Sequence, residues 1–262
     1  MPSKYRIEVE IEEPTAVEPQ HLHANVCRWL EISEAEHNSN HKPFSISPLF
    51  PLDHQTGPNR WGFEIGLLDD QLGHRLEASL KTQHDHPIRL GPVQALLAPG
   101  ASCSLVHQTS WRNLVELSQQ TDISTWTMHA KTPMLFRQGN RDLPFPLAGS
   151  IIRSLERSWS HWSPTDVDGS PWNQDRALGR VKEPARADIN HFSGQSYPIK
   201  VKRRHRIGYV GTISIATPRR SPLHSRQHLD TILRLSPYCG VGSMTTYGLG
   251  VVEIIEHNQK PD

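Results

Sequence analysis

Histidine and lysine side chains gather in the short segment Glu36-His-Asn-Ser-Asn-His-Lys42. A free imidazole titrates near pH ~6.5, so His37 and His41 can each accept or donate a proton close to neutrality. Lys42 adds a cation directly beside them. His21 and His23 form a second histidine pair earlier in the chain. These residue types suit acid–base chemistry next to a negatively charged group.

The same histidines have spacings that also occur at metal sites. His37-x-x-x-His41 has the i, i+4 spacing of zinc enzymes, and His21-x-His23 is a closer pair. However, no Glu follows His37 as in H-E-x-x-H, and the Asn-Ser-Asn interior is a poor helix former. The cysteines are too scattered for a zinc site or a disulfide framework and fit a reducing cytosol: Cys27, Cys103 and Cys239. We therefore expect no metal, no cofactor and a cytoplasmic protein, with zinc binding as the alternative.

A glycine-rich segment runs from Tyr238 to Gly250, with the sequence YCGVGSMTTYGLG. Glycines leave backbone N–H groups unobstructed, and such concavities suit phosphate oxygens. The segment is not a P-loop, because no Lys follows its glycines, and it lacks the G-x-G-x-x-G spacing of a dinucleotide fold. A tight helix-to-strand turn explains the glycines equally well. The candidate phosphate contacts are Gly240, Gly242, Ser243, Thr245 and Thr246.

The densest basic run is Lys200-Val-Lys-Arg-Arg-His-Arg206. On one alternating strand, every second residue would share a face that could contact successive phosphates. The alternative is a solvated strand edge protected by charge. The candidate nucleic-acid contacts in this run are Lys200, Lys202, Arg203, Arg204 and Arg206.

The charge of the chain is divided between its halves. Residues 1–128 carry nine Lys and Arg against 16 Asp and Glu, a balance of −7, whereas residues 129–262 carry 19 against 11, a balance of +8. This asymmetry favours a polyanionic partner bound by the C-terminal half. No apolar run approaches the ~20 residues needed to span a bilayer, so we expect no membrane association.

Hydrophobic periodicity predicts two similar units in tandem. Each has the order β-α-β-β-α-β, which indicates an α+β fold of two ferredoxin-like (RRM-like) domains, 1–123 and 124–262. Residues 161–197 are expected to form a long polar insertion, rich in Pro and Gly. In the first unit we predict strands at 5–10, 43–47, 61–68 and 93–97, and helices from 21 and over 72–80. In the second we predict strands at 125–136, 200–208, 209–216 and 248–256, and helices over 146–159 and 223–235.

Several landmarks together resemble the CRISPR-associated endoribonucleases of the sixth Cas family, the RAMP nucleases that mature guide RNA. The glycine-rich segment resembles the C-terminal loop of that family. Other segments are similar in family order: Lys42-Pro-Phe-Ser-Ile-Ser-Pro-Leu49, Lys131-Thr-Pro-Met-Leu-Phe-Arg137, Leu143-Pro-Phe-Pro146 and Arg206-Ile-Gly-Tyr-Val-Gly211. The resemblance implies metal-independent cleavage of CRISPR repeat RNA that leaves 2′,3′-cyclic phosphate and 5′-hydroxyl ends.

The resemblance also implies roles for the histidines. The family places a catalytic histidine after its first helix, and we prefer His37, because nearby helix carbonyls would favour its charged form as an acid. His41 is the second choice, and Lys42 is the expected transition-state cation. Some members carry a tyrosine on the first helix, for which His23 or His21 would substitute. Members often have a basic residue after the second loop glycine, whereas this chain has Ser243.

The expected partner is CRISPR repeat RNA, together with other CRISPR-associated effector subunits, for a chain that is a monomer or homodimer. The alternative function is a non-catalytic RNA-binding RAMP subunit of a CRISPR effector complex. The histidine and lysine cluster separates these two hypotheses, because RNA binding alone does not need it.

Overall fold

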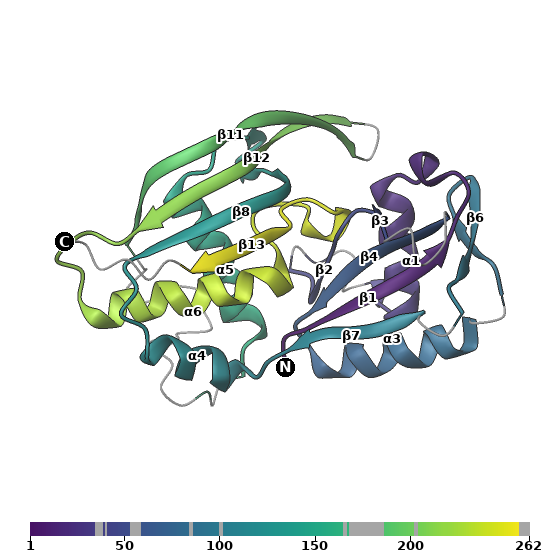
Figure 1. Ribbon diagram of the computed structural model, residues 1–262, viewed down its shortest axis with the longest axis horizontal. Coiled ribbons are helices and arrows are strands. Elements are labelled where there is room, and N and C mark those ends of the chain that lie inside the picture. The colour runs from purple at the N-terminus through teal and green to yellow at the C-terminus, as the bar shows by residue number, and fades with distance from the viewer. Residues whose placement is uncertain are drawn as a thin grey trace.

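The computed structural model of the protein describes residues 1–34, 39, 41–52, 59–83, 86–99, 102–164, 167, 186–201 and 204–256. These residues form two main antiparallel sheets that lie side by side, each with its own helices (Figure 1). The chain is therefore an α+β protein, as predicted. No helix in the described part of the chain is long and apolar enough to cross a membrane.

The N-terminal sheet is built around β1, which pairs with β4 on one side and with β6 and β7 on the other. Along β1, Tyr5, Ile7 and Val9 are buried and alternate with partly exposed charged residues, as expected for a strand covered on one face. Apolar residues of α1 and α3 pack against this buried face. The elements are β1 (Ser3–Glu10), α1 (Pro19–Trp29), β2 (Phe44–Ile46), β3 (Phe50–Pro51), β4 (Arg60–Leu67), α3 (Asp70–Gln83), β5 (Ile88–Leu90), β6 (Val93–Leu97) and β7 (Cys103–Gln108).

The C-terminal sheet has the strand order β11-β12-β8-β13 and repeats the ferredoxin-like arrangement. Its helices α5 and α6 pack against one another and against the sheet. The elements are β8 (Thr125–Met134), β9 (Phe136–Gln138), β10 (Arg141–Leu143), α5 (Ala148–Trp162), β11 (Asp188–Val201), β12 (Arg204–Ala216), α6 (Leu223–Cys239), the 3-10 helix η4 (Thr245–Tyr247) and β13 (Val252–Glu256). The two tandem ferredoxin-like units match the fold predicted from the sequence.

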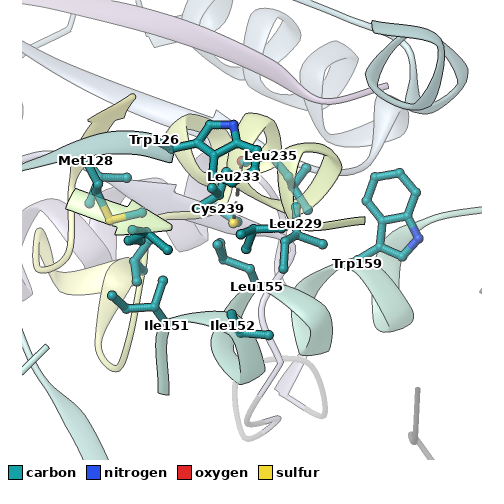
Figure 2. Close-up of a cluster of buried hydrophobic side chains, with 14 of the residues drawn as sticks. Trp126, Met128, Ile151, Ile152, Leu155, Trp159, Leu229, Leu233, Leu235 and Cys239 are labelled. Atoms are coloured by element: carbon teal, nitrogen blue, oxygen red, sulfur yellow. Dashed lines mark hydrogen bonds between the residues drawn. The ribbon is translucent and has the colours of Figure 1, made fainter. Parts of the chain in front are cut away.

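The core of the C-terminal unit fixes the orientation of α5. Figure 2 shows Ile151, Ile152 and Leu155 of α5 directed toward Leu229 and Leu233 of α6. All of these side chains are at most 3% exposed. Because the apolar face of α5 is committed to this core, its opposite, polar face is directed away from it.

Helix α4 (Trp111–Gln119), which the periodicity did not predict, lies between the two units in the chain. Its Ser110 cap accepts a hydrogen bond from the Asn113 amide at 2.9 Å. Trp111, Leu114 and Val115 pack into the core of the C-terminal unit. Helix α4 thus packs with the second unit although it precedes residue 124, and the predicted boundary at 123/124 stays a prediction.

The long hairpin of β11 and β12 corrects two predictions. Residues 188–197, expected within the insertion, belong to β11, and residues 204–216 form one continuous strand. The hairpin therefore turns between Val201 and Arg204, and not at Gly208 and Tyr209. The basic run 200–206 spans this turn, so it does not form one strand with a single basic face. Lys202 and Arg203 lie outside the described residues.

A close contact joins the two units where α6 ends. The Tyr238 carbonyl accepts a hydrogen bond from the Ser45 hydroxyl of β2 at 2.8 Å. A Cβ atom added to Gly66 of β4 would lie 2.0 Å from the same carbonyl oxygen. The glycine at position 66 therefore allows the N-terminal sheet to approach the end of α6, directly before the glycine-rich segment.

We expect Gly66→Ala to lower the free energy of unfolding by about 1–3 kcal/mol, because the added methyl forces the two units apart. Ser45→Ala, which removes only the hydrogen bond to the carbonyl of Tyr238, should cost about 1 kcal/mol. Urea denaturation of both variants measures the difference. A Gly66→Ala protein as stable as wild type would show that this contact does not hold the units together.

Candidate functional site

A cleft of about 480 Å³ opens where the two units meet. Its walls are the segment before β2, the start of β9, the polar face of α5 and the loop between α6 and β13. The cleft thus joins the histidine–lysine segment and the glycine-rich segment, which are about 200 residues apart in the chain. The described residues that line it are Ser39, His41, Lys42, Phe136, Arg137, Ser150, Arg153, Ser154, Arg157, Ser158, Trp162, Cys239, Gly242, Ser243, Met244, Thr245 and Thr246.

The charged residues among the described lining of the cleft are all positive. Lys42, Arg137, Arg153 and Arg157 are cations, and no Asp or Glu is among these lining residues. The three arginine side chains are exposed, so they can reach a ligand in the cleft. A concave surface with cations of one sign focuses the electrostatic potential and attracts a polyanion.

Helix α5 supplies most of this positive charge. Arg153, Arg157 and His161 recur every four residues and therefore lie along one stripe of the helix. A second stripe at the same spacing carries hydroxyl groups on Ser150, Ser154 and Ser158. The sequence prediction missed this face. The four-residue spacing of basic and hydroxyl side chains was the available signal, but nothing in it indicated that α5 faces the histidine segment.

His41 lies in the cleft next to a histidine of the other unit. Its ring centroid is 4.4 Å from that of His161, and the two ring planes are tilted by 30°. Partial burial, followed by the nearby charges of His161 and Arg157, lowers the pKa of His41 below its ordinary value. A lowered pKa keeps the imidazole neutral near pH 7, which suits a proton acceptor.

Hydrogen bonds to Ser39 hold His41 and Lys42 in the segment before β2. The Ser39 hydroxyl accepts a hydrogen bond from the His41 amide at 3.1 Å, and the Lys42 ammonium donates to the Ser39 carbonyl at 3.3 Å. Both predicted residues thus reach the cleft. His37, the preferred catalytic residue in the sequence prediction, lies outside the described residues.

The structure does not bring His23 to the cleft. This side chain is 4% exposed, and its Nδ1 atom lies 3.0 Å from the carbonyl oxygen of Thr246. The ring also stacks on Tyr247, with centroids 4.1 Å apart. His21 accepts a hydrogen bond from the Glu18 amide and helps to cap α1. The position of His23 therefore does not support a catalytic role. The side chain instead packs against Thr246 and Tyr247 of the glycine-rich loop.

In the glycine-rich loop, defined as residues 240–251, several backbone amides already donate hydrogen bonds to other parts of the protein. The bonded pairs are Gly240 N–H to Ser236 O (2.9 Å), Gly242 N–H to Ser154 Oγ (2.9 Å) and Ser243 N–H to Leu135 O (2.8 Å). Gly242 has φ +95°, and a Cβ atom there would lie 2.4 Å from the Leu135 carbonyl oxygen. The expected open amide cradle thus does not hold for Gly240 and Gly242. What the loop offers to the cleft is the hydroxyl groups of Ser243, Thr245 and Thr246.

The basic hairpin residues are partly neutralised by carboxylates. Lys200 forms an ion pair with Glu18 at 3.4 Å, and this contact lowers the pKa of the Glu18 carboxyl. Arg206 forms an ion pair with Asp142. Arg204 is exposed next to the hairpin turn. Among the described residues, the cleft arginines, and not those of this hairpin, therefore form the denser group of cations facing a common space.

Part of the chain matches a known protein family, and several solved structures share its fold. Residues 128–252 match the model of a family described as CRISPR-associated endoribonuclease Cas6. A product complex of Thermus thermophilus Cas6 superposes with a TM-score of 0.78 and 22% identity, covering 97% of this chain and 99% of that chain. A product complex of a second Cas6 gives 0.73 and 20%, with coverage of 97% and 99%. A Cas6-related protein from Pyrococcus furiosus gives 0.60 and 12%, with coverage of 98% and 100%. No curated protein sequence matches the chain.

These structures share the fold along nearly the whole chain, with both ferredoxin-like units present in order. The family match covers the C-terminal unit from β8 to β13, which includes α5 and the glycine-rich loop and therefore most of the cleft wall. The C-terminal unit thus matches the family model of CRISPR-associated endoribonuclease Cas6, and the whole chain shares the two-unit fold of the solved Cas6 structures.

Proposed function

We propose that this chain cuts CRISPR precursor RNA within its repeats to give mature guide RNAs, and that it does so without a metal ion. The observation that carries the proposal is the cleft itself, in which His41 stands among four cations and hydroxyl side chains. Phosphodiester cleavage needs a proton acceptor close to a positively charged group that stabilises the transition state, and this cleft contains both. The family model that residues 128–252 match is described as that of a CRISPR-associated endoribonuclease.

In the proposed reaction, the 2′-hydroxyl of the RNA attacks its own phosphate. His41 accepts the proton of that hydroxyl, for which its lowered pKa is suited. The phosphorane that forms carries extra negative charge, which Lys42 and Arg157 stabilise from the walls of the cleft. Cleavage of the bond to the 5′-oxygen, with transfer of a proton to that oxygen, then leaves a 2′,3′-cyclic phosphate and a 5′-hydroxyl.

Solved relatives support RNA as the ligand. Two of the matching Cas6 structures are described as product complexes and another as a substrate mimic complex. A further matching structure is described as a RAMP protein that binds different RNA substrates, with 10% identity and a TM-score of 0.61. Association with other CRISPR-associated subunits, the choice between monomer and homodimer, and a cytoplasmic location stay predictions from the sequence.

The decisive experiment incubates the protein with labelled repeat RNA in EDTA. We expect a single cut at full rate, products with cyclic phosphate ends, and no cut when the 2′-hydroxyl at the scissile position is replaced by hydrogen. Loss of cleavage in EDTA, with recovery on adding a divalent cation, would instead favour metal-dependent chemistry. RNA binding with no product at any pH would favour the non-catalytic RNA-binding subunit.

A further inference from the structure

We propose that His161, at the end of α5, is the general acid that protonates the departing 5′-oxygen while His41 acts as the general base. This inference rests on the proposed cleavage reaction and assigns its second proton transfer. It makes the active site composite, because His41 precedes β2 in the N-terminal unit and His161 belongs to the C-terminal unit.

The first argument is the spacing of the two rings. Their centroids are 4.4 Å apart and their planes are only 30° from parallel. In-line displacement needs help at the attacking and the leaving oxygen simultaneously, and two-metal phosphoryl enzymes provide it with ions about 3.5–4 Å apart. Two imidazole rings held this close can act on one phosphodiester, one accepting a proton and the other giving one.

The second argument is electrostatic. Two imidazolium cations this close repel each other, so the pair favours one bound proton over two. Partial burial comes first, and the nearby His161 and Arg157 of α5 then further lower the pKa of His41. The lowered pKa of His41 suits this ring as the base, and His161 of α5, the ring beside it, is therefore assigned as the acid.

The third argument is the rigidity of the end of α5. Trp159 is 1% exposed and packs edge-on against Trp111 of α4, with ring centroids 5.1 Å apart. The amide of Ser163 donates to the Trp159 carbonyl at 2.9 Å and closes the helix end. His161 also contacts the Trp162 ring, with centroids 5.2 Å apart. A histidine on such a fixed turn can hold its position opposite His41.

The proton balance of the step is complete. The 2′-oxygen loses its proton to His41 and forms a bond to phosphorus. The bond from phosphorus to the 5′-oxygen breaks, and the proton of the His161 imidazolium passes to that oxygen. The enzyme ends with His41 protonated and His161 neutral, and exchange with water restores the starting state.

The test uses RNA whose scissile 5′-oxygen is replaced by sulfur, because a thiolate leaves readily without protonation. With natural repeat RNA, His161→Gln should slow single-turnover cleavage by roughly 10²–10⁴-fold, the range of a lost general acid. With the sulfur-substituted RNA, His161→Gln should regain a rate close to wild type, whereas His41→Gln should remain slow. The matched control is His74→Gln, an exposed histidine on α3, which should behave as wild type on both substrates.

The outcomes separate this inference from the proposed function. If wild type cuts natural RNA in EDTA and His161→Gln cuts it equally fast, His161 is not the acid, while the proposed endoribonuclease stands. A His161→Gln protein that is slow on both RNAs also overturns the acid role and indicates a role in positioning His41. If wild type cuts neither RNA, the proposed function and this inference fail together. Unchanged RNA affinity of His161→Gln verifies that its fold and binding surface are intact.

Discussion

Alanine in place of His41 is expected to slow single-turnover cleavage of repeat RNA by roughly 10²–10⁴-fold, the usual contribution of one general base. The loss follows from position and charge. His41 lines the cleft, and partial burial with the nearby charges of His161 and Arg157 lowers its pKa. RNA affinity should change little, because the cations that attract phosphates remain in place. Quenched-flow cleavage under saturating enzyme, with binding measured separately on a 2′-deoxy substrate, gives both quantities.

The paired variant His37→Ala decides between the two histidines of this segment. The sequence prediction preferred His37 as the acid next to the helix end. If the proposed assignment to His41 is right, His37→Ala should retain cleavage within a few-fold of wild type. Loss of cleavage in His37→Ala with retention in His41→Ala would restore the sequence prediction and remove His41 from the mechanism, and with it the assignment of His161 as the acid.

The fold could be predicted because apolar residues recur at strand and helix spacing in both ferredoxin-like units. The alternation of Tyr5, Ile7 and Val9 predicted β1, and the Leu72, Leu76 and Leu80 spacing predicted α3. The hairpin was placed wrongly because Gly194 was assigned to the polar insertion and the strand was expected to begin at Lys200, after Pro198. Gly194 and Pro198 both lie in β11, an edge strand, where a proline costs no hydrogen bond on its open side.

The candidate site could be predicted only in part, because its parts come from distant segments. The histidine–lysine segment and the glycine-rich loop stood out by composition alone. The arginines of α5 did not, because an amphipathic helix with a basic face is common on protein surfaces. Whether Arg157 faces solvent or His41 depends on how the two units pack, and that is decided by contacts such as those of Gly66 and Tyr238. Close contacts also explain why the roles of Gly240 and Gly242 were misjudged. These glycines allow close packing, and their amides are already hydrogen-bonded.

The second large effect is expected for Arg157→Gln, which should lower the cleavage rate by roughly 10²–10³-fold, the usual loss when one transition-state donor is removed. Arg157 is exposed in the cleft and close enough to His41 to lower its pKa. Arg153→Gln should mainly weaken binding and reduce the slope of log affinity against log salt by about 1, as for a single phosphate contact. Arg219→Gln, an exposed arginine between β12 and α6, is the matched control and should leave rate and affinity unchanged.

The pH dependence of the cleavage rate distinguishes an effect of Arg157 on the pKa of His41 from a general loss of structure. A base works in its neutral form, so the rate falls when the pH drops below the pKa of His41. Partial burial and the charges of His161 and Arg157 hold that pKa below its ordinary value, and removing the Arg157 charge should therefore raise it. The acidic limb of the Arg157→Gln profile should accordingly move to higher pH relative to wild type. An acidic limb that stays in place, with the rate reduced equally at every pH, would mean that Arg157 acts on the phosphate alone and that another group sets the limb.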